Sequence, residues 1–333
     1  MNITFVAMSS FRTEVPIEPA PFSLDHRSGI VTLGSCFSDT VGLKLLANKF
    51  RVAPNPLGTV YNPISIHRLL TYCLGQPGPD ASAWQQSGER WVHPDFHSRF
   101  SGLDKEMAIK ALNAAMTDTV RYLTPVSTVI LTYGTAWVFE SEQTGQIVAN
   151  CHKLPASHFR QRLLQVDEIV SDFIRVKNLL KERGVNRIIL TVSPVRHVKS
   201  TLERNSVSKS VLRMACHQLS HEVESVSYFP AFEIMMDDLR DYRFYTSDMI
   251  HPSEVAGDYI WEKFSSAYFS KATQEVIAAW KDLSKALQHR PFHPESAGHL
   301  KFLRDVHSRL KSLSTLIDVS EELQSLESQL NQP

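Results

Sequence analysis

The sequence predicts an α/β fold in which helices cover both faces of a mostly parallel sheet. Short apolar runs alternate with longer helical patterns, glycines end several of them, and 333 residues are enough to bury a sizeable core. The composition, with 43% hydrophobic and 21% charged residues, is that of an ordinary globular protein. The 35 basic and 35 acidic residues balance, so no overall charge favours nucleic acid or an anionic membrane as a partner.

The first predicted strand is followed by a tight turn and a helix. Residues 30–33 form a buried-strand run, Gly34 breaks it, and apolar residues at helical spacing continue to Phe50. The next stretch, 52–63, is rich in Pro, Asn and Gly and is predicted to be an ordered loop. Residues 72–103 contain many Gly, Pro and Ser residues and are predicted to be a surface insertion.

The remaining elements continue the alternation. The predicted helices and strands cover, in turn, about 104–122 (helix), 127–134 (strand), 157–183 (helix), 187–194 (strand), 207–225 (helix) and 254–269 (helix). Residues 138–151 predict a β-hairpin with its turn at Thr144-Gly145. Because ligands bind at the carboxyl ends of parallel strands, we expect the site at the turns that follow the strands.

The residues from about 298 onward repeat leucine, valine and isoleucine at alternating spacings of three and four. One apolar seam covers 303–317, and a second, shifted in register, covers 316–330. The pattern predicts either a helical hairpin packed on the body or a coiled-coil contact in a homodimer. We assign residues 271–333 to a helical C-terminal extension and residues 1–270 to the main domain.

The number of cysteines and the length of the apolar runs indicate the cellular compartment in which the protein is expected. Four cysteines in a chain of this length do not make a disulfide framework, and no Cys-x-x-Cys pair suggests structural zinc. Residues 1–15 lack the basic region and the apolar stretch of a signal peptide. No apolar run approaches the roughly 20 residues that a membrane helix needs. We therefore expect a cytoplasmic protein with reduced thiols and no membrane span.

Two candidate nucleophiles, Ser35 and Cys36, stand where the first predicted strand turns into a helix. Such a turn lifts a side chain out of the sheet, and the helix amino terminus offers N–H groups and the positive end of a dipole. For a cysteine, this environment is expected to lower the thiol pKa. A capping residue or a small buried residue is the ordinary alternative at either position.

A candidate base follows much later in the chain, at His251, three residues after Asp248. A carboxylate at this spacing can hold the tautomer of the imidazole while the other ring nitrogen faces a nucleophile. The Asp-x-x-His pattern is short and weak by itself. Together with the upstream Gly-Ser-Cys-Phe segment, it predicts a nucleophile and its base.

Several longer motifs resemble the GSCFA family, a bacterial group named after its amino-terminal motif. They are TLGSCFSDTVG, NPLGTVYNP, NCHKLP, SPVRH, YFPAFEIMMDDLRDYRFY and DMIHPS, and they span roughly residues 20–270. GSCFA proteins are similar to SGNH/GDSL hydrolases. The resemblance therefore implies a flavodoxin-like SGNH-hydrolase fold of three layers, and a catalytic domain within residues 1–270.

The resemblance also implies which residue is the nucleophile. Against the esterase pattern Gly-Asp-Ser-Leu, Cys36 stands at the serine and Ser35 at the aspartate. A similar Gly-Asn-Cys pattern, in related acetyltransferases of polysaccharide biosynthesis, again places cysteine at the nucleophile. We therefore expect an acyl-enzyme on Cys36, with Ser35 as the alternative, and His251 and Asp248 as base and orienter. Thioesters exchange readily with other acceptors, which favours acyl transfer as well as hydrolysis.

The oxyanion donors match the family pattern less closely. Gly58, in the segment that begins at Asn55, matches the glycine of the second esterase block. The third block should read Gly-x-Asn-Asp, but residues 134–137 contain no asparagine. The hydroxyl of Thr135 and the side chain of Asn150 are the two candidate replacements.

Further residues are candidate substrate contacts. Arg196 and His197 follow a predicted strand and suit a carboxylate or phosphate, with helix capping or ion pairing as the alternative. Trp137 is a candidate pocket wall, although core packing is the commoner role of tryptophan. His152 is a further candidate contact. No metal is expected at Cys151 and His152, because adjacent ligands without a second local pair make a poor zinc site.

Two functional hypotheses follow. The first is an esterase or acyltransferase that acts on a small-molecule or glycan ester or thioester without a cofactor, a coenzyme A thioester being one candidate donor. The second is a non-catalytic module that binds an acylated ligand in the same cleft and recruits partners through its C-terminal helices. The missing asparagine of the third block favours the second hypothesis. The set of Cys36, Asp248 and His251 favours the first.

Overall fold

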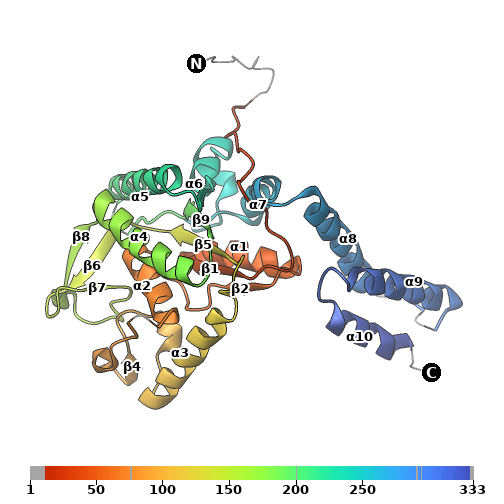
Figure 1. Cartoon of the computed structure of the whole chain (residues 1–333), viewed down its shortest axis with the longest axis horizontal. Coiled ribbons are helices and arrows are strands. Elements are labelled where there is room, and N and C mark those ends of the chain that lie inside the picture. Colours follow the sequence, from red (N-terminus) through yellow and green to blue (C-terminus); the bar gives the residue numbers. More distant parts are fainter. Residues whose placement is uncertain (1–11, 76, 200, 290–291, 294, 331–333) are drawn as a thin grey trace.

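Five parallel strands form the central sheet of the computed structural model, in the order β10, β9, β5, β1 and β2 (Figure 1). Their bounds, in that order, are Val226–Tyr228, Arg187–Val192, Thr128–Tyr133, Ile30–Gly34 and Val52–Pro54. Numbered along the chain, this is the 2-1-3-4-5 order of flavodoxin-like sheets. The structure describes residues 12–75, 77–199, 201–289, 292–293 and 295–330. Residues 1–11, part of the segment in which no signal peptide is expected, lie outside them.

Side chains of the central strands alternate between two cores. On β1, Val31 and Leu33 face the larger core, while Ile30 faces the other. The parallel register places Ile30 beside Thr128 and Leu33 beside Leu131. Because both faces are buried, β1, β5 and β9 are mostly apolar, with threonine as the recurrent polar residue, and show no strict alternation with polar residues. This burial explains why these three strands were visible in the sequence.

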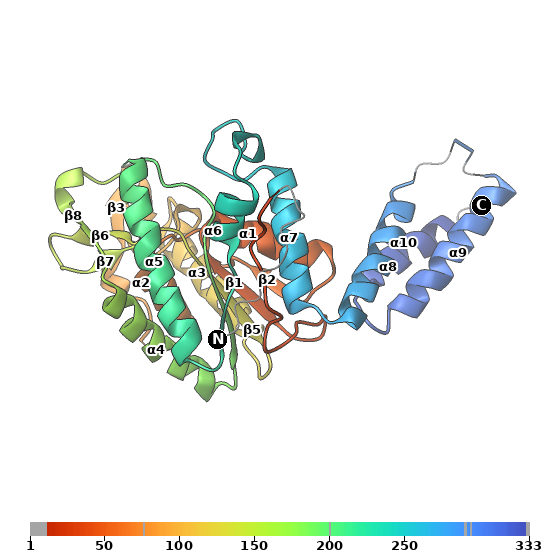
Figure 2. The ribbon, with the colours of Figure 1, turned by 90° about the horizontal axis from the view of Figure 1, so that it is seen from above.

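Helices cover both faces of the sheet. One layer contains α2 to α5, with bounds Pro63–Cys73, Lys105–Val120, Val166–Glu182 and Leu202–Glu222. The other contains α1, α6 and α7, with bounds Cys36–Ala47, Ala231–Glu233 and Glu254–Tyr268. Figure 2 shows α4 and α5 on one side of the strands and α1 and α7 on the other. The predicted three-layer α/β fold is confirmed.

A smaller sheet at one side of the molecule contains the predicted hairpin. Strands β6 (Trp137–Ser141) and β7 (Ile147–Val148) form this hairpin, and β8 (Phe159–Leu163) pairs with the other edge of β6. The prediction of a helix from residue 157 was therefore wrong at its start, since α4 begins at Val166. Arg160 and Arg162 of β8 bind the buried carboxylate of Glu140 on β6, so strand pairing overrides the local helical pattern.

The segment between α2 and α3 forms the short antiparallel pair β3 (Gln85–Ser87) and β4 (Arg90–Val92). This part of the predicted surface insertion contributes to the larger core, because Trp84, Phe96 and Phe100 are buried there. It therefore packs against the body of the domain through aromatic side chains.

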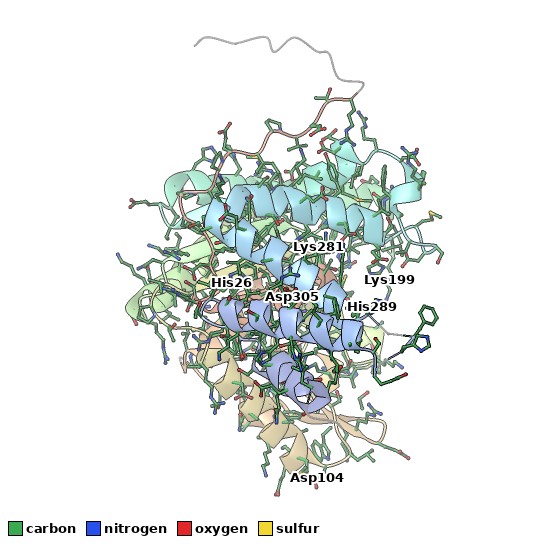
Figure 3. All side chains as sticks on the ribbon, turned by 90° about the vertical axis from the view of Figure 1, so that its right-hand side faces the viewer. His26, Asp104, Lys199, Lys281, His289 and Asp305 are labelled. Atoms are coloured by element: carbon green, nitrogen blue, oxygen red, sulfur yellow. The ribbon has the colours of Figure 1, made fainter. Side chains whose placement is uncertain are left out.

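The last helices, α8 (Lys271–Leu287), α9 (Ala297–Leu313) and α10 (Ser320–Leu330), have an apolar core of their own. Figure 3 views the molecule from their side, with Lys281 on α8 and Asp305 on α9. Residues of both predicted apolar seams pack in this core within one chain, as expected for a helical hairpin. Leu316 is the exception, because it is exposed. Trp280 joins the bundle to α1 by donating to the carbonyl of Ala47 at 2.7 Å. A homodimer through these helices stays a prediction.

Candidate active site

The turn after β1 places Cys36 at the carboxyl edge of the sheet. Gly34 has a φ of +137°, and a Cβ there would lie 2.2 Å from the carbonyl oxygen of Thr132, so only glycine fits. Ser35 is buried and caps α1, its Oγ accepting the N–H of Phe37 at 3.3 Å. Cys36, the first residue of α1, is only partly buried. The cysteine, not the serine, thus reaches the surface of the turn.

A cavity of about 270 Å³ brings Cys36 and His251 together. It lies between the amino-terminal turns of α1 and α7, and Phe37, Val195 and Gly257 contribute to its lining. Ser35 does not line it. The two segments that the sequence singled out, far apart along the chain, therefore meet at one cavity.

A carboxylate orients the imidazole of His251. Its Nδ1 lies 2.7 Å from Oδ2 of Asp248, whose Oδ1 accepts the backbone N–H groups of Ile250 at 2.8 Å and His251 at 3.0 Å. The hydroxyl of Thr246 also donates to Asp248, at 2.6 Å. These hydrogen bonds hold the pKa of the Asp248 carboxyl far below its ordinary value, and the bond from Thr246 has the largest effect. The carboxylate stays charged beside Nδ1, which leaves Nε2 for a partner in the cavity.

The thiol of Cys36 is protonated at rest. Burial raises its pKa, and the carboxylate of Asp39 raises it further. The N–H groups of Cys36 and Phe37 and the ammonium of Lys209 act in the opposite direction without reversing the shift. The expectation that the helix amino terminus lowers this pKa was therefore wrong, because loss of hydration outweighs the dipole. Such a thiol needs a base, and His251 lines the same cavity.

Alkylation of Cys36 by iodoacetamide should consequently require a high pH in a His251→Ala variant. Only the thiolate reacts, so a raised pKa moves the midpoint of the rate profile above the ordinary thiol value of 9.0. Peptide mapping by mass spectrometry at a series of pH values measures this midpoint. Asp39→Asn should move it to lower pH, because the variant removes a charge that opposes the thiolate. A midpoint below 9.0 in the presence of Asp39 would contradict the burial argument.

The expected second-block residues support the turn and do not face the cavity. The N–H of Gly58 already donates to the carbonyl of Asn55 at 2.9 Å. Asn55 is buried, and its side chain accepts from the N–H of Gly34 at 3.2 Å and donates to Asp39 at 3.0 Å. The roles predicted for Gly58 and Asn55 as oxyanion donor and substrate contact therefore do not fit this structure.

Thr135 and Trp137, predicted as an oxyanion donor and a pocket wall, both bond to residues of α5. The hydroxyl of Thr135 lies 3.1 Å from that of Ser208 and accepts the N–H of Trp137 at 3.1 Å. The indole of Trp137 donates to the carbonyl of Arg204 at 3.0 Å, and the guanidinium of Arg204 lies 3.8 Å from the ring centroid. Neither predicted contact lines the cavity of Cys36, so both have structural roles here.

Asn150 and His152 lie beside the β3–β4 segment, also outside that cavity. Asn150 Oδ1 accepts the N–H of His152 at 2.8 Å, and His152 Nε2 lies 2.8 Å from the carbonyl oxygen of His93. Burial lowers the pKa of His152. Local bonding thus replaces the predicted substrate contacts. Within the described part of the chain, no three His, Cys, Asp or Glu side chains gather as they would around a metal ion.

Arg196 anchors the loop that carries His251 and does not line the cavity of Cys36. Its guanidinium lies 4.4 Å from the ring centroid of Tyr245 and 5.2 Å from that of Tyr242. Its backbone N–H donates to the carbonyl of Ile250 at 3.2 Å, directly before His251. These contacts position the loop of His251. Arg196 also lines a separate cavity of about 200 Å³ beside Tyr242 and Tyr245, so its predicted binding of an anion stays a prediction.

His197 lies behind the site, against Gly134 and the ring of Tyr61. Its Nε2 is buried and has no hydrogen-bond partner among the described residues. Burial, followed by the charge of Lys209, lowers its pKa to about 3, so the ring is neutral at physiological pH. A neutral imidazole offers no positive charge to a carboxylate or phosphate, and His197 does not line the cavity of Cys36.

Lys209 of α5 is a buried charge that acts on Cys36 without lining the cavity, and the sequence reasoning missed it. Its buried Nζ donates to the carbonyls of Gly134 at 2.8 Å and Ser193 at 2.7 Å, at the ends of β5 and β9. Burial lowers its pKa to about 7. Lys209 shares a helical face with the buried Leu212 and Cys216, three and seven residues later. A lysine on an otherwise apolar helix face was the signal that pointed to it.

Comparison with known protein families gives two matches. A model described as the GSCFA family matches residues 29–264, and a model described as the GSCFA domain protein, C-terminal domain, matches residues 280–332. No curated protein matches the chain. The first match includes every residue that lines the cavity of Cys36. Among the described residues, no helix is both long and apolar enough to span a membrane.

Proposed function

The chain belongs to the GSCFA family, and from this premise we propose that it is an esterase or acyltransferase that forms an acyl-enzyme on Cys36. The observation that carries the proposal is the cavity shared by Cys36 and His251, with His251 held by Asp248 at 2.7 Å. Nucleophile, base and orienter are then contributed by three side chains, as in a catalytic triad. The flavodoxin-like strand order supports an SGNH-type arrangement.

The proposed reaction has two halves. In the first, Nε2 of His251 takes the thiol proton while the sulfur of Cys36 attacks the acyl carbonyl carbon, and Asp248 stabilises the imidazolium. The bond from the acyl carbon to the leaving oxygen or sulfur breaks, and His251 returns the proton to that atom. In the second half, His251 deprotonates water or another acceptor, which attacks the thioester carbon. The bond from this carbon to the sulfur breaks, and His251 returns the proton to the sulfur of Cys36.

The amino terminus of α1 is the proposed oxyanion site. The first N–H groups of a helix have no acceptor within it, and they point out of its amino-terminal end. The N–H groups of Cys36 and Phe37 act on the sulfur, where they lower the thiol pKa. The N–H of Cys36 and the helix dipole would stabilise negative charge on the carbonyl oxygen of the substrate, whereas the N–H of Phe37 is shared with Oγ of Ser35 at 3.3 Å.

The size of the cavity supports an acyl group of short or medium length as the substrate. A methylene takes up about as much space as a water molecule, ~30 Å³, so a cavity of about 270 Å³ between Phe37, Val195 and Gly257 accommodates several of them. We expect kcat/KM to rise from p-nitrophenyl acetate to the hexanoate, since each buried methylene contributes about 0.8 kcal/mol, and to rise no further with chains too long for the cavity. Release of p-nitrophenol measures these rates. A higher kcat/KM for the palmitate than for the hexanoate would contradict this assignment of the pocket.

Substitution of the nucleophile tests the proposal. Cys36→Ala should abolish turnover of the acetate ester, because the variant lacks the sulfur that carries the acyl group. Cys151→Ala is the matched control, since this cysteine is also partly buried but lies outside the cavity. Full activity of the Cys36→Ala variant would exclude the acyl-enzyme.

A non-catalytic binding module is the second candidate. The occupied N–H of Gly58 and the inward-turned Thr135 favour it, because an esterase of this type uses donors from these blocks. This candidate predicts that wild type binds an acetyl ester without turnover and that Cys36→Ala binds it equally well. Turnover that depends on Cys36 would exclude it.

A further inference from the structure

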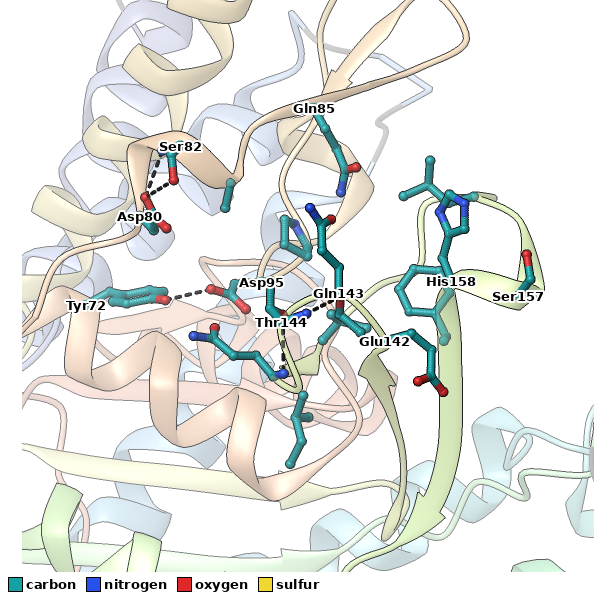
Figure 4. A pocket seen from close by; sticks show the side chains of 18 residues that line it. Tyr72, Asp80, Ser82, Gln85, Asp95, Glu142, Gln143, Thr144, Ser157 and His158 are labelled. Carbon is teal, nitrogen blue, oxygen red and sulfur yellow. Dashed lines mark hydrogen bonds between the residues drawn. The ribbon is translucent and has the colours of Figure 1, made fainter.

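A second cavity, of about 610 Å³, lies apart from Cys36 (Figure 4). Its walls come from α2, the β3–β4 segment, the β6–β7 hairpin and the start of β8. It shares no lining residue with the cavity of Cys36. Its volume falls in the range of pockets that hold small ligands.

A buried acid fixes the floor of this second cavity. Asp95, 7% exposed, accepts hydrogen bonds from Arg68 and from the hydroxyl of Tyr72, the latter at 2.6 Å. Arg68 also donates to the carbonyl of Ile147 on β7 at 2.7 Å. The carbonyl of Pro94 accepts two backbone N–H groups from the residues after β7. These bonds join the β3–β4 segment to the hairpin, so the cavity is formed before any ligand enters.

Three glutamines around the opening have side-chain amides that can hydrogen-bond to a ligand. Within the described residues, the side-chain amides of Gln85, Gln143 and Gln146 make no hydrogen bond. Figure 4 shows Gln85 and Gln143 extending into the same opening, from β3 and from the β6–β7 turn. Each amide offers two donor hydrogens and an acceptor oxygen, a combination that matches a hydroxyl group in either direction.

The charges of the lining select against anions. None of the described residues that line the cavity is lysine or arginine, whereas Asp80 and Glu142 are both present. The carboxylate of Asp95 is already paired with Arg68. A phosphate or carboxylate ligand would therefore meet repulsion without a counter-charge. The ring of Phe159 offers an apolar surface beside these polar groups.

We propose that this second cavity binds a neutral saccharide, with the amides of Gln85, Gln143 and Gln146 pairing with its hydroxyls. The C–H face of the sugar ring packs on Phe159, and the fixed floor of Asp95 and Tyr72 limits how deeply it enters. The proposal does not depend on acyl chemistry at Cys36, because the two cavities have separate linings.

Ligand-observed NMR titrations with maltose, cellobiose, lactose and N,N′-diacetylchitobiose test the proposal. At least one of these sugars should bind wild type and Cys36→Ala with the same Kd, which separates this site from the proposed activity. The double variant Gln85→Ala/Gln143→Ala should weaken binding by about tenfold, from the loss of two hydrogen-bonding side chains. The matched double variant Gln324→Ala/Gln329→Ala, on the exposed face of α10, should leave Kd unchanged.

A second variant covers the case in which the first one perturbs the hairpin. Ser157→Trp, at an exposed lining position, should fill the opening and abolish binding while the thermal unfolding midpoint stays that of wild type. Failure of all four sugars to bind wild type would overturn the proposal. So would a Kd of either cavity variant equal to that of wild type.

Discussion

His251→Ala should lower the turnover of short-chain esters and thioesters by about a thousandfold, the middle of the range for a positioned general base. The loss should be large because burial and Asp39 raise the pKa of the Cys36 thiol, so little thiolate exists without a base. Asp248 already fixes the imidazole through a 2.7 Å bond to Nδ1. The variant therefore removes the proton acceptor from an otherwise assembled site.

The measurement is kcat/KM with p-nitrophenyl acetate, together with far-UV circular dichroism to show that the fold is intact. His217→Ala is the matched control, because His217 is an exposed histidine on α5 outside the cavity. Asp248→Asn should also reduce activity, since an amide cannot stabilise the imidazolium as a carboxylate does. Unchanged activity of His251→Ala would remove this histidine as the base.

Gly34→Ala should destabilise the fold by about 3 kcal/mol or more, a magnitude typical of steric strain at a fixed turn. Its φ of +137° is unfavourable for alanine, and the new Cβ would lie 2.2 Å from the carbonyl oxygen of Thr132 on β5. The backbone cannot easily shift, because Ser35 N–H donates to that same oxygen at 3.1 Å. The side chain of Asn55 holds the N–H of Gly34 from the other side.

Gly75→Ala separates the clash from the cost of backbone conformation. Gly75 also has a positive φ, +77°, but a Cβ there would meet nothing within 4 Å. Its replacement should cost only about 1 kcal/mol, from the left-handed conformation alone. Urea denaturation of both variants measures the difference. Equal stabilities would mean that the turn before Cys36 can move, which would contradict the rigid placement of Cys36.

The parts of the fold that could be predicted are those whose burial produces a recognisable pattern of apolar residues in the sequence. Strands β1, β5 and β9 are buried on both faces and were found as continuous apolar runs. β2 and β10 have three residues each, too few for any period to show. α2 begins with Pro63 directly after a segment rich in Pro, Asn and Gly, which resembled a loop. β8 was missed because its partner, β6, lies outside any local window.

The candidate site also has features that the sequence could predict and features that it could not. Cys36 and His251 were recognisable because each belongs to a local pattern, a strand–turn–helix junction and an Asp-x-x-His loop. The direction of the thiol pKa could not be predicted, since it depends on how α1 and its neighbours exclude water. The sequence could not show that the N–H of Gly58 and the hydroxyl of Thr135 are bonded elsewhere, because their hydrogen-bond partners are set by the folded structure.

Mass spectrometry of the protein after a brief exposure to p-nitrophenyl acetate or acetyl coenzyme A, quenched in acid, tests the central claim most directly. Acid slows the release of a thioester, so the intermediate survives for peptide mapping. The account predicts one acetyl group on the peptide that contains Cys36, and none after Cys36→Ala. Acetylation of Ser35, or turnover without any acetyl group on Cys36, would contradict it.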